Sequence, residues 1–189
     1  MSIDCVAATL AIALVAPATV DPAAEPAPTG LRAPGYYVHV SPGGFTFLTL
    51  RPFDYLGYLW GLAGGRFIPR GKRLAIAVGG FVEHVVIQAP RYEDDTDRYH
   101  FVRTGPELRV GASDERVFGY GLARLGVDTM FGQPGGFGFV QGLFTLGAGV
   151  QGAFGSARRL LLGLEPAFEI SFPVPWPLAR VRTFIGVRF

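Results

Sequence analysis

Lysine, cysteine and long apolar runs are all scarce in this chain of 189 residues. Lys72 is the one lysine and Cys5 the one cysteine, so the sequence offers no intrachain disulfide. Charged residues make up 17% of the chain, below the quarter that is usual in soluble domains. The net charge of +2, without a clustered basic stripe, gives no support for nucleic-acid binding. Beyond the first twenty residues, no apolar run reaches the roughly 18 residues that a membrane helix needs.

The N-terminal segment is the one exception to that lack of apolar runs, and we interpret residues 1–18 as a signal peptide. The run "CVAATLAIALVAPATV" ends in the small-x-small pattern that a signal peptidase reads, at Ala16-Pro17-Ala18. The residues before it are atypical, because they include Asp4 and no Lys or Arg. Residues 19–35 are rich in Pro and Ala and predict a disordered leader, which leaves 36–189 as the folded unit.

Glycine and phenylalanine are abundant, with 27 and 16 copies, and they occur in segments of alternating polarity. The alternation predicts eight strands, at 36–50, 53–67, 73–88, 99–112, 117–131, 137–154, 159–173 and 178–189. Short charged turns alternate with longer loops between them; the turns are at 69–72, 113–116 and 155–158, and the loops at 89–98, 132–136 and 173–177. The first segment could instead form two short strands around Pro42–Gly44.

Each predicted strand has one apolar face and one mixed face. In 159–173, for example, Glu165 and Glu169 share a face that is opposite Leu162, Leu164 and Phe168. The apolar faces extend over seven or more positions, about 20 Å, which matches the apolar band of a membrane barrel. A water-facing surface would be rich in Lys, Glu, Thr and Ser, whereas the mixed faces carry mostly glycine, aromatics and a few charges of both signs. This pattern predicts the interior of a narrow closed barrel.

The charges on the mixed faces predict a network of ion pairs inside that barrel. Twelve candidate inward charges, seven basic and five acidic, include Arg66, Glu83 and Arg188. The residues that we expect to form the lumen network are Arg103, Glu107, Arg109, Arg124, Asp128, Glu165, Glu169, Arg180 and Arg182.

Aromatic residues gather toward the predicted strand ends, as the two interfaces of a membrane select. We predict one aromatic girdle from Phe131, Phe137, Phe139, Phe172 and Trp176. A second belt at the opposite ends comprises Phe67, Phe118, Phe154 and Phe189.

The export signal, the amphipathic strands, the alternating turns and the terminal "RVRTFIGVRF" together resemble the small bacterial outer-membrane β-barrels of the OmpA/OmpX type. The resemblance implies an all-β fold, an eight-stranded antiparallel up-and-down transmembrane β-barrel. In that family the last residue is typically Phe after alternating apolar residues, and the barrel-assembly machinery reads this signal. Val181, Ile185, Val187 and Phe189 fit the signal. The other implied partners are outer-membrane lipid and lipopolysaccharide, and both termini are expected in the periplasm.

A structural or envelope-stabilising role without enzymatic activity is the expected function, since eight strands leave a lumen just wide enough for side chains. The alternatives are a narrow channel or small-solute carrier, a surface-binding protein and a lipid A-modifying enzyme; a soluble lipid-binding barrel is the alternative fold. An enzyme would use His84 and His100, but the neighbouring Glu83 points to the opposite face. The acidic loop residues lack the spacing of a cation site; they are Glu93, Asp94, Asp95 and Asp97. We predict no catalytic residue, metal site or cofactor.

Overall fold

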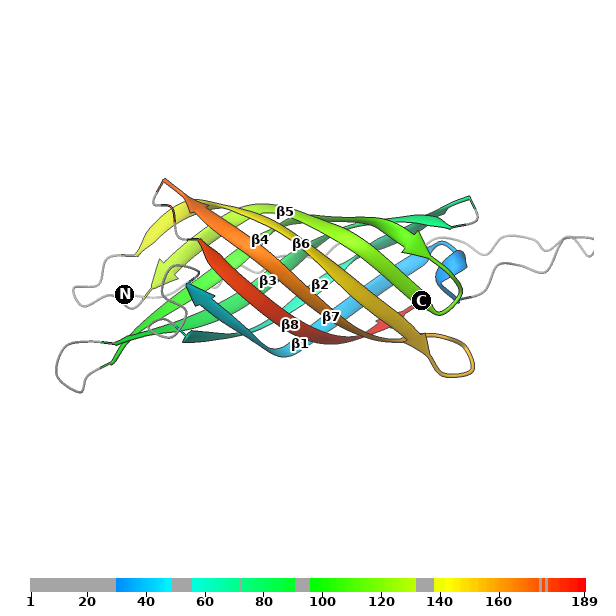
Figure 1. Cartoon of the computed structure of the whole chain (residues 1–189), viewed down its shortest axis with the longest axis horizontal. Helices are drawn as coiled ribbons and strands as arrows, with labels where there is room; N and C mark the ends of the chain where they lie inside the picture. Colours follow the sequence, from blue (N-terminus) through cyan, green and yellow to red (C-terminus); the bar gives the residue numbers. More distant parts are fainter. Residues whose placement is uncertain are drawn as a thin grey trace, which may run out of the picture.

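Eight antiparallel strands close into a barrel in the computed structural model of the chain, which describes residues 30–48, 56–71, 73–90, 96–131, 138–173, 175 and 177–189. The strands are β1 (Gly35–Leu48), β2 (Leu56–Arg70), β3 (Leu74–Pro90), β4 (Thr96–Ser113), β5 (Val117–Phe131), β6 (Phe139–Phe154), β7 (Leu160–Phe172) and β8 (Leu178–Arg188). Each strand pairs with the next, and β8 returns to pair with β1 (Figure 1). The predicted eight-stranded up-and-down barrel is confirmed.

The first strand is continuous, so the alternative of two short strands is wrong. Its pairing with β2 shifts between Ser41 and Phe45, and its pairing with β8 shifts between Val40 and Gly43. These shifts enclose Pro42, whose nitrogen cannot donate a ladder hydrogen bond, and a bulge is where a strand accommodates such a residue. The irregularity therefore bends β1 without ending it.

The outward face of the wall is apolar and the inward face is polar at its centre. Within the part of the chain that the structure describes, thirty large apolar side chains are exposed, among them Leu125 (61%), Phe168 (44%) and Ile185 (43%). On β7 their neighbours Glu165 and Glu169 are buried at 0% and 1% exposure. The period of two predicted from the sequence is therefore present, with the apolar side outward.

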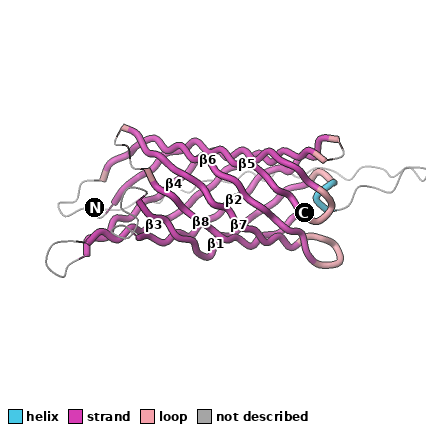
Figure 2. Tube along the Cα trace, viewed as in Figure 1, coloured by secondary structure: helices cyan, strands magenta, loops and turns pink. Residues whose placement is uncertain are grey.

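The two ends of the barrel differ in their connections (Figure 2). At one end, which we call the turn end, the short turns 71–73, 114–116 and 155–159 join the strands, and Gly35 and Phe189 also lie there. The opposite end, which we call the loop end, carries the connections after β1, β3, β5 and β7. Gly71 and Gly155 have φ values of 67° and 82°, a left-handed conformation that glycine adopts without steric cost.

A short 3-10 turn, η1 (Gly30–Arg32), closes the mouth of the turn end. Leu31 is fully buried, its nitrogen donates to the Glu115 carbonyl at 3.1 Å, and Arg188 donates to the Gly30 and Ala33 carbonyls. Leu31 belongs to an apolar cluster that we call the turn-end plug, made of Leu31, Tyr37, Phe67, Ala75, Ala77, Phe118, Tyr120, Leu122, Ala153 and Leu161. The expectation of a disordered leader missed this anchored segment.

Two members of the plug correct the predicted second belt. Phe67 and Phe118 are buried at 2% and 1% exposure and meet edge to face at 5.1 Å inside the barrel. They follow the inward alternation of their strands, and proximity to a strand end does not override that alternation. Phe154 and Phe189 do lie outward, at 49% and 66% exposure.

A second apolar cluster fills the barrel at the loop end, and we call it the loop-end plug. Its buried residues are Leu59, Val85, Ile87, Phe101, Met130 and Leu178, with Tyr99 and Phe139 packed against them. Phe139 was predicted in the outer aromatic girdle, and this is wrong, because it shares the inward face of β6 with Gln141 and Leu143.

Candidate functional site

Ten charged side chains fill the middle of the lumen, between the two plugs. All are 2% exposed or less, and we call them the lumen network; they are Glu83, Arg103, Glu107, Arg109, Arg124, Asp128, Glu165, Glu169, Arg180 and Arg182. The nine residues predicted for the network all point inward, and Glu83 joins them. Five arginines face five carboxylates, so the network is formally neutral.

Strand register places opposite charges directly across from each other. Glu83 on β3 is opposite Arg103 on β4, and Arg103 is in turn opposite Asp128 on β5. Further along the barrel, Glu107 is opposite Arg124. The pair of Glu165 and Arg182 repeats the arrangement between β7 and β8. Since side chains directly opposite on one face lie within reach of each other, the strand register sets up the ion pairs Arg103–Asp128, Glu107–Arg124 and Glu165–Arg182.

Glu83 pairs with three arginines of the network, each at 2.8 Å or less. It accepts from Arg124 at 2.8 Å, from Arg182 at 2.7 Å and from Arg180 at 2.5 Å. Both oxygens are used, and the three arginines come from β5 and β8, on other sides of the barrel. Room for this arrangement comes from Gly61, where an added Cβ would lie 2.7 Å from the Glu83 Cγ.

Two further carboxylates extend the network toward the turn end. Glu107 pairs with Arg124 at 2.6 Å and with Arg109 at 2.9 Å. Glu165 pairs with Arg182 at 2.6 Å. Tyrosines then cap both carboxylates. The hydroxyl of Tyr37 donates to Glu107 at 3.0 Å, and that of Tyr120 donates to Glu165 at 3.1 Å.

The network also reaches toward the loop end without a break. Glu169 binds Arg180 at 2.9 Å and Arg103 at 2.5 Å, and Arg103 lies 3.3 Å from Asp128. Ion pairs therefore run continuously from Asp128 to Arg109 and involve strands β3, β4, β5, β7 and β8. Removal of one member of a buried pair leaves a charge without compensation, which costs about 3–5 kcal/mol. The arrangement braces the barrel from the inside, because each charged side chain of the network has at least one partner of opposite charge.

Aromatic rings also pack against two arginines of the network, Arg124 and Arg109. The Arg124 guanidinium lies 4.5 Å from the Phe81 ring, and that of Arg109 lies 5.0 Å from Tyr120 and 5.4 Å from Phe184. Cation–π contacts of this kind strengthen when both groups are removed from water. They join the lumen network to the turn-end plug through Tyr120.

Two predicted inward charges lie elsewhere. Arg66 is exposed on the outward face of β2, because it alternates with the inward Phe67. Arg188 points inward but holds η1 at the mouth. The predicted imbalance of seven basic and five acidic residues is therefore corrected to five of each in the network.

The sequence analysis assigned no role to His39, which lies at the edge of the network. Its ring stacks on Phe184 at 4.3 Å, and its Nδ1 lies 3.2 Å from Arg109 Nη1. The alternation of Tyr37, His39 and Ser41 against Tyr36, Val38 and Val40 was the signal that could have placed it inward.

The other two histidines lie on the outward face, as their alternation with Glu83 predicted. His84 and His100 stack at 5.4 Å, and a hydrogen bond of 3.3 Å joins their rings. Trp60 packs against His84 at 5.4 Å. Each imidazole thus finds a partner in the other, on the side of the wall away from the carboxylates.

The residues of the predicted assembly signal alternate outward along β8, with exposures of 38% for Val181, 43% for Ile185, 51% for Val187 and 66% for Phe189. Phe189 stacks on Tyr36 at 6.2 Å where β8 meets β1. Of the predicted girdle, Phe131 and Phe172 are outward at 49% and 52% exposure. Phe137 and Trp176 lie outside the described residues, and so do Glu93, Asp94 and Asp95 of the acidic loop.

No protein family matches the sequence, and no curated protein is significantly similar to it. Among solved structures, the chain is similar to Ail, the attachment invasion locus protein of Yersinia pestis, with a TM-score of 0.39 and 15% identity over 82% of this chain and 97% of that one. At those values the fold assignment depends on the strand pairing alone. Within the described residues, no helix has the length and apolarity to cross a membrane, and no group of three His, Cys, Asp or Glu could hold a metal ion.

Proposed function

We propose that this protein is an outer-membrane barrel with a structural, envelope-stabilising role and a lumen that does not conduct. The observation that carries the proposal is the neutral lumen network held between two apolar plugs. A permeating ion would have to displace Leu31 and Phe118 at one end and Phe101 and Met130 at the other. Between these plugs it would have to break ion pairs of 2.5–2.9 Å.

The outward wall supports the assignment to a bilayer. A soluble monomer rarely exposes an apolar patch of more than a few hundred Å². Here thirty large apolar side chains are exposed among the described residues, and they recur at alternate positions of all eight strands. Closure of β1 on β8 also satisfies the requirement that no backbone edge remains unpaired in hydrocarbon.

The proposed orientation has the turn end in the periplasm and the loop end outside. Short periplasmic turns and longer external loops are the rule for outer-membrane barrels. It follows that both Gly35 and Phe189 lie at the periplasmic side, where the terminal residues of β8 would meet the assembly machinery.

Two measurements on one preparation test the proposal. Outer-membrane fractions should contain a band that shifts on heating before electrophoresis, and purified protein in planar bilayers should give no stable openings of porin size. A soluble periplasmic band that does not shift would contradict the membrane assignment. Reproducible large openings from a correctly located barrel would contradict only the closed lumen.

A further inference from the structure

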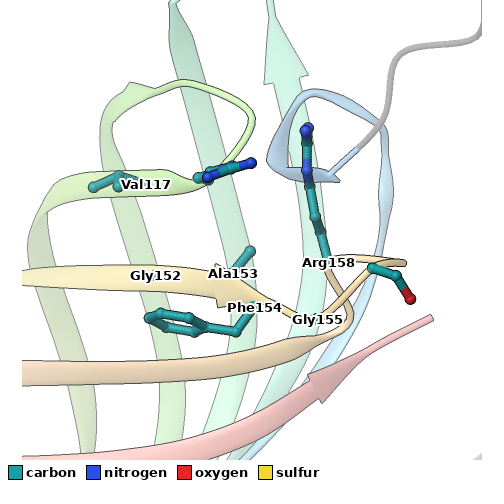
Figure 3. A pocket seen from close by; sticks show the side chains of 8 residues that line it. Val117, Gly152, Ala153, Phe154, Gly155 and Arg158 are labelled. Carbon is teal, nitrogen blue, oxygen red and sulfur yellow. The ribbon is translucent and has the colours of Figure 1, made fainter.

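A hollow of about 440 Å³ opens on the rim of the turn end, between the turn that joins β4 to β5 and the turn that joins β6 to β7. Figure 3 shows Arg158 rising beyond Gly155 in the second turn, with Gly152 and Phe154 along the adjoining end of β6. The hollow lies where the apolar wall gives way to polar turns, which in a membrane barrel is the level of the lipid headgroups.

One side of the hollow is an apolar shelf on the outward face, formed by Val117 and Phe154. Val117 and Phe154 are 45% and 49% exposed there, and Val117 pairs in register with Gly152. Gly152 adds no side chain, and the Phe154 ring lies over it, since an added Cβ would be 2.8 Å from that ring. The shelf is therefore flat, outward and continuous with the surface that meets the acyl chains.

Basic and hydroxyl side chains also line the hollow. Arg116 and Ser156 are exposed, and Arg116 makes no ion pair with any described residue. Arg158 also lines the hollow and pairs with Glu115. Arg116 is thus the charge at the hollow that an incoming anion can neutralise.

The two acidic residues near the hollow, Asp114 and Glu115, already accept hydrogen bonds from other groups. Asp114 Oδ1 accepts hydrogen bonds from the backbone N–H of Arg116 at 2.6 Å and from the backbone N–H of Val117 at 2.7 Å. These bonds hold the pKa of Asp114 below its usual range. A hydrogen bond from Arg158 likewise lowers the pKa of Glu115. Arg32 and Arg159 are exposed at the same end, so arginine outnumbers carboxylate around the hollow.

We propose that this hollow binds an anionic phospholipid of the leaflet at the turn end. Its phosphate lies on Arg116 and Ser156, and the first carbons of an acyl chain lie on Val117 and Phe154. The proposal rests on the membrane function proposed above. Guanidinium groups bind phosphate through paired hydrogen bonds, and the adjoining apolar shelf selects a lipid over a free phosphate ion. One arginine near the surface favours an anionic over a zwitterionic headgroup by about fivefold.

The test is lipid selectivity measured by electron spin resonance, with the folded full chain in vesicles of phosphatidylcholine that contain spin-labelled phosphatidylglycerol or spin-labelled phosphatidylcholine. The wild-type protein should immobilise the anionic label in preference to the zwitterionic one. Arg116→Gln should reduce that preference by roughly fivefold. Arg98→Gln is the matched control, because Arg98 is an exposed arginine near the loop end, on the other side of the bilayer.

A second variant distinguishes binding at the hollow from a general attraction of anionic lipid by the arginines. Phe154→Ser keeps every arginine but removes the shelf, so it should also lower the preference for the anionic label. Equal selectivity in wild type, Arg116→Gln and Phe154→Ser would overturn the proposal, as would full displacement of the label by inorganic phosphate at constant ionic strength. If the wild-type protein inserts into neither vesicle, the proposed membrane function itself fails, and heat-modifiability on the same samples identifies that case.

Discussion

The inner and outer faces of the same eight strands should tolerate different kinds of substitution. On β7, Glu165 and Glu169 are buried and fixed by several arginines, while Leu164 and Phe168, each 44% exposed, alternate with them on the outside. The inner residues need specific partners at specific register positions. In the proposed bilayer setting the outer residues need only be apolar, since lipid chains have no geometry to match. Mutations should therefore act through lost partners inside and through depth in the bilayer outside.

The largest effect is expected at Glu83. Glu83→Gln removes the charge that neutralises Arg124, Arg180 and Arg182, so it should lower the free energy of unfolding by about 3–5 kcal/mol. Urea unfolding in lipid vesicles, followed by tryptophan fluorescence, measures the change. The matched control is Arg66→Gln on the outward face, expected to cost less than about 0.5 kcal/mol. Equal midpoints for both variants would remove the distinction between the faces.

A charge on the outer wall should act through its depth. Leu125→Arg lies in the middle of β5 and should cost about 2–4 kcal/mol, whereas Phe172→Arg at the end of β7 should cost about 0–1 kcal/mol. The same unfolding assay in vesicles gives both values. If the two variants cost the same, the outward side chains do not meet a bilayer with a central hydrocarbon layer.

A charge placed in the turn-end plug should disturb only that end of the barrel. Leu31→Asp places a carboxylate among Phe67, Phe118 and their neighbours, so η1 should detach while the barrel stays closed. Loss of one buried leucine, worth about 2 kcal/mol, raises the detached fraction by roughly tenfold or more. Trypsin cleavage after Arg32 measures this detachment, with Leu31→Met as the control of similar volume. Unchanged cleavage would show that burial of Leu31 does not hold η1.

A small effect on stability is expected at the last outward side chain. Phe189 is 66% exposed, so its deletion should cost only about 1 kcal/mol in detergent. If it forms part of an assembly signal, the same deletion should strongly reduce the folded barrel in outer-membrane fractions of cells. The comparison is wild type against deletion at low expression. Equal amounts of folded barrel would show that the terminal aromatic is not read during assembly.

The alternation of polarity predicted the fold, because a period of two assigns each residue to a face without knowledge of its neighbours. The nine residues that it assigned to the lumen are all buried at 2% exposure or less. It could not reveal that Glu83 contacts β8, since that contact depends on closure of the barrel. The girdle and the second belt were predicted less well, because position near a strand end was given more weight than alternation at Phe67, Phe118 and Phe139. Burial of Leu31 could not be predicted either, because the apolar opening that it fills at the turn end exists only in the folded barrel.

The contacts of Glu83 also order the events of folding. Its partners Arg180 and Arg182 follow it by 97 and 99 residues, on the last strand. Until β8 pairs with β1, the Glu83 carboxylate lacks two of its three arginine partners, and we expect it to stay hydrated. We therefore expect dehydration of the lumen and closure of the sheet to occur together, and contacts so distant in sequence should make this step slow. An arriving strand that lacked these arginines would leave a hydrated, incomplete barrel, which gives the cell a physical difference between finished and unfinished chains.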